Sequence, residues 1–382
     1  MLHAILYDEL GMRLFGYISV RVAMAALSAF ALALLLGRPV IAWLRGHRVR
    51  EDVSKTDAPE LAAMAAQAGK GATPTMGGSF LVAALLVSVL LWARLDNLHV
   101  VIGVLMTAGL AAVGFVDDYK KLTIPGCKGL SRGAKMVGLS ATVLGALGAL
   151  AWYAKTSGRE TVLALYPPFF KDVEVPLGQW GVLGLLAFLA FEWLVVVGSA
   201  NAANITDGMD GLAAGCMIIS GLALTVFCYV TGRPDWTDYL NLPHVVQASE
   251  MAVVGGALCG ACMGFLWYNA YPARVFMGDS GSLPLGGVLA WMALVSKQEL
   301  VLPLIACVFV ADLASSWMQT FWFRRTGGSR LFTLAPIHHG LERYGGVFTR
   351  REEGWHEVQV VVRFWIVAAC GAMASLALLK VR

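Results

Sequence analysis

The sequence predicts an all-α polytopic membrane protein with about ten transmembrane helices and both chain termini on the outer side of the membrane. Hydrophobic residues make up 58% of the 382-residue chain and charged residues only 14%, which is too little charge to cover a soluble surface. The apolar stretches are long and continuous, which favours helices, because a membrane barrel would show alternating polarity. Lys and Arg gather in alternate connections between these stretches, and this bias sets the orientation.

The transmembrane helices are predicted from the length of the apolar stretches. About 20 apolar residues cross a bilayer, with some tolerance for tilt. Ten stretches fit, and they cover residues 18–44, 76–93, 98–117, 134–154, 180–199, 211–231, 250–268, 283–297, 300–323 and 359–380. The eighth stretch is short. No repeat of fixed period divides the chain, so we expect a single integral-membrane domain over residues 1–382.

The distribution of charge predicts which connections are cytoplasmic. With the N-terminus outside, the four connections that follow spans one, three, seven and nine hold most of the Lys and Arg. Every unusual polar stretch of the chain falls on this inner side. The net charge of +4 is modest, so we expect the lipid bilayer, and no nucleic acid, among the partners.

The second inner connection begins with a pair of acids. Asp117 and Asp118 follow a continuous apolar run, and adjacent carboxylates repel each other and are costly to desolvate. The pair therefore indicates a metal or a cationic ligand, and the alternative is a helix end with two solvated acids. Ser131 is placed to cap the next helix, which would put Arg132 and Lys135 on one face of its first turns. These cations fit either a phosphate clamp opposite the acids or the positive-inside bias alone.

The third inner connection, residues 201–211, combines amides with acids and contains no Lys or Arg. Asn204, Asp207 and Asp210 are its main polar side chains. The two acids would share a face if the sixth helix began here. Amides, carboxylates and glycines suit the recognition of a base or sugar, or the binding of a hard cation, whereas a structural loop has little need of them.

Three shorter polar stretches complete the inner face. Glycines and Pro74 surround Lys70 and Thr75, which fits either an anion-binding turn or a flexible turn before a helix. Further on, Asn269 and Phe276 precede Asp279, whose glycine neighbours permit a tight backbone that could bring the acid to a metal. Phe276 could stack on a planar base, although Phe is also common at membrane interfaces.

The last inner connection holds two adjacent histidines, His338 and His339. Neutral imidazoles can bind a metal, hydrogen-bond a phosphate or act as acid and base. In the span before them, Asp312 and Gln319 lie two helical turns apart, on roughly one face, and run towards the same inner surface.

Taken together, the inner connections hold the apparatus of phosphoryl transfer. A hard divalent cation held by carboxylates, with Lys, His and amide contacts, neutralises and positions phosphates. The chain has no P-loop, HExxH or GxSxG motif. A membrane enzyme with such a site would take one lipid-borne partner and one soluble phosphorylated partner.

Five stretches resemble, in order and spacing, the motifs of the phospho-N-acetylmuramoyl-pentapeptide transferase family. They are Gly71–Gly78, Gly114–Tyr119, Asn201–Gly211, Phe265–Ser282 and Ala335–Glu342. The resemblance implies a ten-helix, Mg2+-dependent transferase at the cytoplasmic face of the bacterial inner membrane. It implies transfer of phospho-MurNAc-pentapeptide from UDP-MurNAc-pentapeptide to undecaprenyl phosphate, which yields lipid I and UMP in the first membrane step of peptidoglycan synthesis.

The resemblance also assigns roles to individual residues. The residues with implied catalytic roles are Asp117, Asp118, Asp279, Lys135 and His338. Asp279 matches the family's magnesium ligand, and we include Asp117 and Asp118 in the predicted metal site. The predicted substrate-binding residues are Lys70, Thr75, Asn204, Asp207, Asp210, Asn269, Phe276, Gln319 and His339. One departure stands out, because Gly340 occupies the place of a third consecutive histidine.

The sequence leaves several alternatives open. A sister transferase that moves GlcNAc-1-phosphate onto polyprenyl phosphate would share the acids, and a secondary transporter would place buried acids at broken helices near the midplane. The order of the chemical steps, the acid that binds metal, the third residue of the pentapeptide and the effect of Gly340 stay open. The oligomeric state is open too, a homodimer being one candidate.

Overall fold

The computed structural model describes residues 2–47, 73–124, 126–170 and 173–380. Within these ranges the regular elements are helices, apart from an isolated antiparallel bridge between Leu165 and Val175. The all-α prediction is confirmed. The α-helices are α1 (Ile18–Gly46), α3 (Gly78–Trp92), α4 (Leu98–Thr123), α5 (Arg132–Thr156), α6 (Gly181–Thr206), α7 (Leu212–Thr231), α8 (Pro234–Leu240), α9 (Met251–Asn269), α10 (Asp279–Val295), α11 (Leu302–Ile305), α12 (Cys307–Arg325), α13 (Ile337–Tyr344) and α14 (Glu357–Ala377).

Seven of the described helices are long and apolar enough to cross a membrane, namely α1, α4, α5, α6, α7, α9 and α14. The other three predicted stretches are helical as well but fall short by this measure. α3 has 15 residues and α10 has 17. The ninth stretch is split into α11 and α12, and α12 carries polar side chains along its length.

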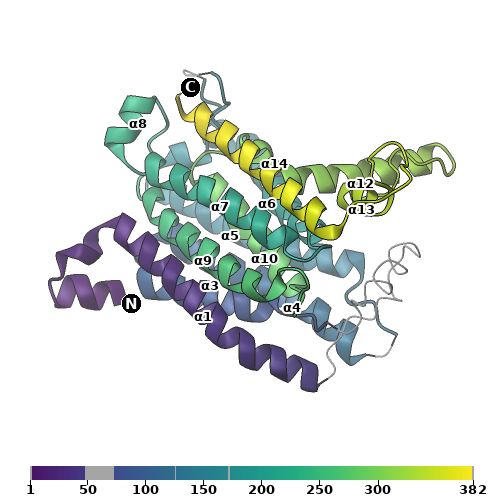
Figure 1. The fold of residues 1–382 in the computed structure, drawn as a ribbon. Coiled ribbons are helices and arrows are strands. Elements are labelled where there is room, and N and C mark those ends of the chain that lie inside the picture. Colours follow the sequence, from purple (N-terminus) through teal and green to yellow (C-terminus); the bar gives the residue numbers. More distant parts are fainter. Residues whose placement is uncertain (1, 48–72, 125, 171–172, 381–382) are drawn as a thin grey trace.

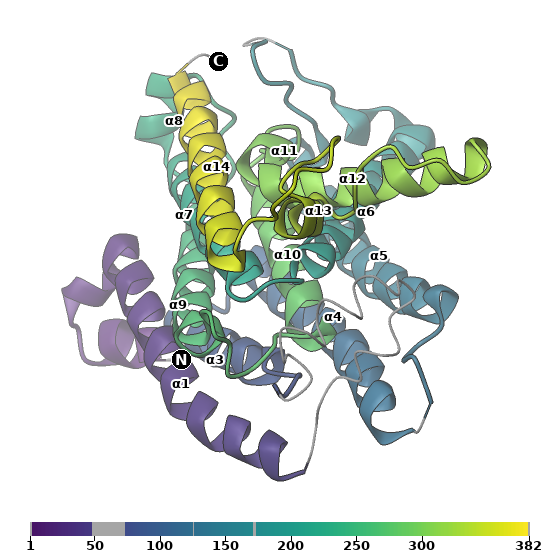
Figure 2. The same ribbon diagram turned by 45° about the vertical axis from the view of Figure 1, so that its right-hand side comes forward.

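The bundle is organised around α10, whose residues are all buried. α10 packs against α4, α6, α7 and α3, and α9 joins α1, α3 and α7 beside it (Figures 1 and 2). Glycines permit the closest crossings. A side chain on Gly78 of α3 would lie 2.2 Å from the backbone nitrogen of Gly281 in α10. The helix that begins with Asp279 is therefore held on several sides.

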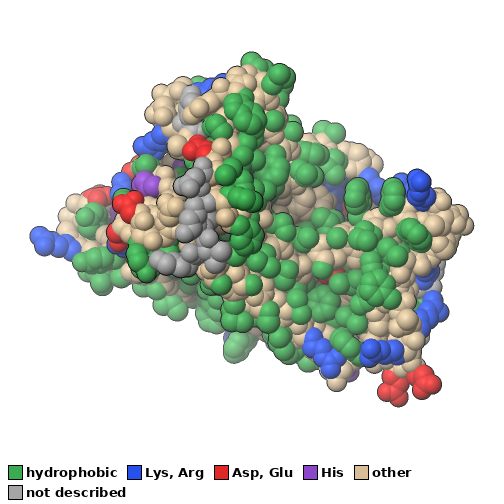
Figure 3. Space-filling view, turned by 90° about the horizontal axis from the view of Figure 1, so that it is seen from above, with side chains coloured by type: hydrophobic (Ala, Val, Ile, Leu, Met, Phe, Trp, Pro, Cys, Tyr) green, Lys and Arg blue, Asp and Glu red, His purple; other side chains and the backbone are tan. Residues whose placement is uncertain are grey.

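The polar connections meet at one end of the bundle. The C-terminal ends of α4, α6 and α9 meet the N-terminal ends of α5, α7 and α10 there, through hydrogen bonds described below. In Figure 1 both chain termini and α8 lie on the left, whereas α12 and α13 extend to the right. Figure 3 shows hydrophobic side chains across the middle of one face and charged side chains towards its two ends, as expected for a membrane-embedded bundle.

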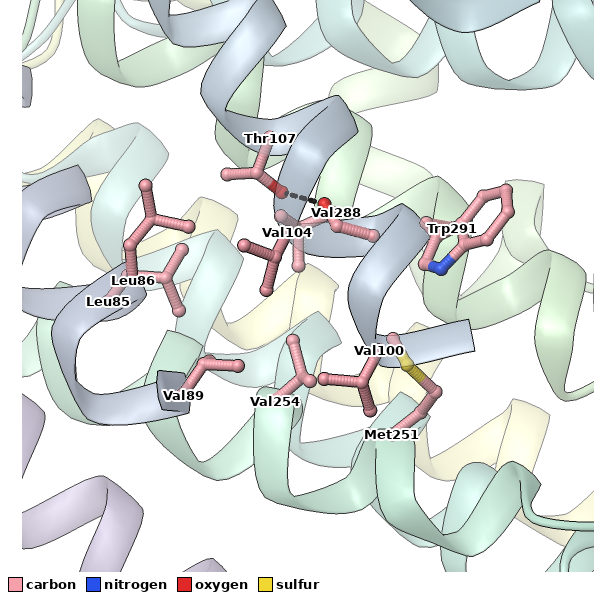
Figure 4. Close-up of a pocket in the computed structure, with 11 residues that line it drawn as sticks. Leu85, Leu86, Val89, Val100, Val104, Thr107, Met251, Val254, Val288 and Trp291 are labelled. Carbon is pink, nitrogen blue, oxygen red and sulfur yellow. Dashed lines mark hydrogen bonds between the residues drawn. The ribbon is translucent and has the colours of Figure 1, made fainter. Parts of the chain in front are cut away.

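One part of the helix core holds only a small cavity. Between α3, α4, α9 and α10 lies an apolar cavity of about 10 Å3, lined by side chains such as Leu85, Val100 and Trp291 (Figure 4). The hydroxyl of Thr107 turns back to donate to the Gly103 carbonyl oxygen at 2.6 Å. A cavity of this size holds one water at most, so it offers no room for a ligand.

A buried ion pair ties α1 to the start of α9. Arg21 and Glu250 form two hydrogen bonds, one of them between Arg21 Nη2 and Glu250 Oε2 at 2.9 Å. Glu250 Oε1 also accepts from the backbone nitrogen of Arg94 at 2.8 Å. Both side chains are almost fully buried, so each charge is stabilised only while the other is present.

We expect Glu250→Gln to destabilise the protein by about 3 kcal/mol, because it leaves the Arg21 guanidinium buried without its counter-charge. The free energy of unfolding in detergent micelles measures this. Asp235→Asn is the matched control, since the Arg233–Asp235 pair is exposed and we expect little change there. An equal loss of unfolding free energy in Glu250→Gln and Asp235→Asn would show that burial does not make the Arg21–Glu250 pair more important than the exposed one.

Candidate active site

Three carboxylates meet where α4 passes the N-terminus of α10. Asp117, Asp118 and Asp279 each place an oxygen within 4.8 Å of the others. They are 3%, 3% and 8% exposed. The sequence predicted the apolar span to end at Asp117, but α4 continues to Thr123. The two acids of α4 therefore lie within the helix, where packing against α10 buries them.

Two lysines neutralise most of this charge. The ammonium nitrogen of Lys121 lies 2.7 Å from Asp117 Oδ2 and 3.1 Å from Asp279 Oδ2. The ammonium of Lys135 lies 2.7 Å from the same oxygen of Asp279. If all five groups are ionised, the cluster keeps one excess negative charge. Lys135 was among the predicted site residues, and Lys121 was expected to supply positive charge nearby, which its spacing of three and four residues from the acids of α4 also indicates.

Asp118 acts as a cap for α10. Its Oδ1 accepts from the backbone nitrogen of Asp279 at 3.3 Å, and its Oδ2 accepts from Ser280 at 2.9 Å. A carboxylate at a helix N-terminus is favoured by the free amides and the helix dipole. Gly278 has φ +73°, and a side chain there would lie 2.7 Å from Asp118 Oδ2. The glycine therefore makes the contact possible.

The connection between α4 and α5 folds back onto Asp117. Asp117 Oδ1 accepts from the backbone nitrogen of Leu130 at 2.6 Å. Gly129, at φ +95°, passes so close that a side chain would lie 2.7 Å from the same oxygen. Ser131 caps α5 as predicted, its hydroxyl accepting from the Ala134 nitrogen at 3.2 Å. This turn aims Lys135 at the acids.

Asn204, near the end of α6, holds the remaining oxygen of Asp279. Its Nδ2 donates to Asp279 Oδ1 at 2.6 Å and lies 2.9 Å from the Ser282 hydroxyl. Asn204 was predicted to contact substrate, and here it touches the acid cluster directly. Ser282 was not predicted, although its position one turn after Asp279 in α10 indicates that the two side chains share a face.

The condition under which Asp207 and Asp210 would share a helix face is not met, because no helix begins at these residues. Asp207 caps the C-terminus of α6, and α7 begins only at Leu212, after Gly211 at φ +80°. The two acids therefore lie on a tight turn between helices. Asp210 Oδ2 accepts from the backbone nitrogen of Ala273 at 2.8 Å, which ties this turn to the connection that leads into α10.

Asn269 makes a second tie between the same two loops. Its side-chain oxygen accepts from the backbone nitrogen of Gly211 at 3.0 Å, and its nitrogen donates to the Val275 carbonyl at 3.0 Å. The side chain is 3% exposed. These contacts make Asn269 part of the scaffold that shapes the loops around the acids.

The segment before α3 runs beside the segment before α10. Phe276 donates its backbone N–H to the Pro74 carbonyl at 2.8 Å and accepts from Gly77 at 2.8 Å. Thr75 is buried and faces Gly278. The Phe276 side chain is half-buried. Lys70, the other residue predicted in this stretch, lies outside the described residues.

The two histidines lie at the start of α13. His338 Nδ1 is 2.8 Å from Asp312 Oδ2 of α12, and His339 Nδ1 is 3.2 Å from Glu342 Oε2. Both rings reach the α6–α7 turn, since a side chain on Gly208 would lie 2.7 Å from His338 Nε2 and 3.0 Å from His339 Nε2. The predicted histidines thus contact the third inner connection at Gly208.

Gln319 of α12 contacts the chain segment that precedes α13. Its side-chain oxygen accepts from the backbone nitrogens of Leu331 and Phe332 at 3.0 and 2.9 Å. Asp312 and Gln319, which were expected to lie on roughly one face of their helix, both contact the segment that contains or precedes the histidines. Asp312 contacts the first histidine, and Gln319 holds the chain that leads to it.

The carboxylate cluster fits a hard divalent cation. Its donors are oxygens from three acids, which suit Mg2+ or Ca2+ better than softer metals. The excess negative charge of the cluster would be offset by such an ion. Among the described residues this is the one group of three or more His, Cys, Asp or Glu side chains with donors this close.

Comparison with known proteins gives consistent matches over almost the whole chain. Residues 100–297 match the family described as glycosyl transferase family 4. The chain is 40% identical over 374 residues to proteins named phospho-N-acetylmuramoyl-pentapeptide-transferase from Neisseria gonorrhoeae (strain NCCP11945) and Neisseria meningitidis serogroup C (strain 053442). Each match covers 97% of this chain and 96% of the relative.

Proposed function

The chain belongs to the phospho-N-acetylmuramoyl-pentapeptide transferase family, and from this premise we propose that it transfers phospho-MurNAc-pentapeptide from UDP-MurNAc-pentapeptide to undecaprenyl phosphate. The products are lipid I and UMP. The observation that carries the proposal is the buried cluster of three carboxylates and two lysines at one end of a membrane bundle. Such a cluster can hold a metal and neutralise a diphosphate.

Asp279 and Asp117 are the proposed Mg2+ ligands, and Asp118 completes the carboxylate set while it fixes the backbone of Asp279. Bound Mg2+ would supply charge neutralisation at the UDP diphosphate. Lys121 and Lys135, already within hydrogen-bond distance of the acids, bring further positive charge to the transferred phosphate.

The reaction is a displacement at the β-phosphorus of the donor. An oxygen of the lipid phosphate forms the new bond, and the bond from this phosphorus to the bridging oxygen breaks. The electron pair and the bridging oxygen leave with UMP. Asp117, whose second oxygen is fixed by Leu130, orients the acceptor phosphate or takes its proton.

A two-step route is the alternative, in which a carboxylate first attacks the donor and forms a covalent phospho-sugar enzyme. Incubation with labelled UDP-MurNAc-pentapeptide and no lipid separates the two routes. Label retained on the denatured protein would establish the covalent route, and its absence at full enzyme activity would favour direct transfer.

The remaining predicted residues are proposed as donor-binding or scaffold residues. The proposed donor contacts are Lys70, Thr75, Asp207, Phe276 and His339, with Asn204 placed to contact both donor and acid cluster. Asp210, Asn269 and Gln319 support the same pocket through backbone contacts. His338 is the proposed catalytic imidazole.

A largely apolar cavity between the helices, whose lining does not include the three acids, supports a lipid acceptor. It has a volume of about 220 Å3 and lies between α6, α10 and α12. Its lining reaches Ala203, the neighbour of Asn204, and continues along Leu302 and Phe309. Part of a polyprenyl chain would lie here, with its phosphate at the acids.

The proposed membrane placement has ten spans, both termini on the periplasmic side and the active site on the cytoplasmic face of the inner membrane. The distribution of Lys and Arg supports this orientation. The position of both termini at the end away from α13 supports it too (Figure 1). A homodimer remains part of the proposal.

The activity should be sensitive to the close packing of α4 against α10 at Gly114. A side chain on Gly114 would lie 2.1 Å from the Asp279 carbonyl oxygen. We expect Gly114→Ala to lower UMP release about 10²-fold, because it displaces the acid cluster. Gly145→Ala on α5 is the matched control, since no atom lies within 4 Å of that position. Parental activity of Gly114→Ala would contradict the geometry.

Donor competition tests the proposed substrate. The runner-up is a sister enzyme that moves GlcNAc-1-phosphate onto polyprenyl phosphate, and the histidine stretch favours the muramoyl donor. With both UDP-sugars at equal concentration, we expect the labelled lipid product to carry MurNAc-pentapeptide. A GlcNAc-bearing lipid as the main product would overturn the assignment.

A further inference from the structure

The contact between Asp312 and His338 is the most deeply buried acid–base pair on the inner side of the bundle's described part. Both side chains are 0% exposed, and His338 Nδ1 lies 2.8 Å from Asp312 Oδ2. Asp312 Oδ1 and His338 Nε2 have no hydrogen-bond partner among the described residues. Neither group is used by the acid cluster around Asp279.

The burial constrains the charge of the pair. An isolated carboxylate is costly to bury, and His338 is the only basic group with a described contact to Asp312. Asp312 Oδ2 therefore accepts a hydrogen bond from the Nδ1–H of His338. This hydrogen bond fixes the orientation of the ring, so that Nε2 points away from α12.

The position of Gly208 shows that Nε2 of His338 faces the turn between α6 and α7. A side chain on Gly208 would lie 2.7 Å from this nitrogen, and Gly208 itself is exposed in the turn between α6 and α7. Nε2 is buried against this turn, and only a glycine fits beside it at position 208. A buried polar atom without a partner is unfavourable, and a ligand oxygen that reached Nε2 would satisfy it.

We propose that Asp312 is a positioning residue, which holds His338 so that Nε2 donates a hydrogen bond to a phosphate oxygen of the nucleotide-sugar donor. The proposal rests on the function proposed above and adds a residue to which no role was assigned. Binding of the anionic phosphate favours the imidazolium form, in which Asp312 carries the compensating charge.

The structure around Gly340 supports the assignment of this role to His338. A side chain at position 340 would lie 2.9 Å from the Thr333 hydroxyl and 3.1 Å from the Leu334 carbonyl oxygen. Residues Thr333 and Leu334 therefore leave no room for a histidine side chain at position 340. His339, by contrast, pairs with Glu342 in a half-buried contact, which holds its ring less firmly.

The test is a double-mutant cycle on the full-length enzyme in detergent, with UDP-MurNAc-pentapeptide, undecaprenyl phosphate and Mg2+. We expect Asp312→Asn to lower kcat about 10²-fold, with the donor KM changed less than about threefold. His338→Ala should lose about the same, and Asp312→Asn should cost nothing further in that background. Glu342→Gln, at the neighbouring pair, is the matched control and should keep kcat within about threefold.

If kcat of the double variant fell by the product of the two single effects, Asp312 would act independently of His338, and the proposal would be overturned. Parental kcat in Asp312→Asn would overturn it too. If Asp312→Asn does not fold, Gly208→Ala provides the second test, since its methyl group would block Nε2. It should lower kcat in the parent more than in His338→Ala, where the methyl group meets only His339, and an equal effect in both would refute the proposed role.

The outcome also separates this inference from the proposed function. If His338→Ala is impaired while Asp312→Asn is not, the transferase assignment stands and the positioning role fails. If His338→Ala turns over like the parent, the catalytic role of the imidazole fails with it. Lipid I formation by the parent enzyme is measured in the same assay and reports on the function alone.

Discussion

Asp279→Asn is expected to lower UMP release by about 10³-fold, the largest effect of any single substitution considered for this protein. The carboxylate lies at the start of the buried helix α10 and contacts Lys135, Lys121 and Asn204. An amide of the same shape keeps the packing and removes the charge. Steady-state UMP release measures the change, and thermal unfolding in detergent shows that the fold survives.

The control for this substitution is Asp235→Asn, on the exposed α8 at the other end of the bundle. We expect parental activity from it. Asp117→Asn should resemble Asp279→Asn, because both carboxylates face the same ammonium group of Lys121. Parental turnover by Asp279→Asn would remove the acid cluster from the mechanism.

Removal of divalent cations is expected to have the second largest effect. Incubation with a chelator should abolish UMP release, and added Mg2+ should restore it, because the donor diphosphate and three acids then face each other without a counter-ion. The lysines cannot supply this charge alone, since the cluster keeps an excess negative charge with both ammonium groups in place.

The control measurement is the thermal stability of the protein in the presence of the chelator. Thermal unfolding should change little, because the acids already have hydrogen-bond partners in Leu130, Ser280 and Asn204. Undiminished activity in the chelator would show that the cluster works without a metal. Loss of the fold would make the cluster a structural site.

The sequence predicted the helical class and the location of the site because those features depend on local patterns. Continuous apolar runs mark helices, and the acids, amides and histidines stand out against them. Asp117, Asp118 and Asp279 were selected for this reason, and the structure brings them together. Their meeting depends on the alternation of spans, which the charge bias already implied.

The contacts within the site could not be read from the sequence. Asp118 caps a helix that begins more than 150 residues later, and no local pattern links a carboxylate in α4 to amides in α10. The approach also depends on Gly114, where a side chain would lie 2.1 Å from the Asp279 carbonyl oxygen, and nothing in the sequence near Gly114 indicates this contact. Asp207 and Asp210 do not share a helix face, because α7 begins after both of them, at Leu212.

The transferase assignment is tested most directly by UMP release from UDP-MurNAc-pentapeptide with and without undecaprenyl phosphate and Mg2+. The account predicts continuous release only when donor, lipid and Mg2+ are all present, with lipid I formed in equal amount. Continuous release from UDP-GlcNAc at the same rate, or undiminished release without the lipid or without Mg2+, would contradict it.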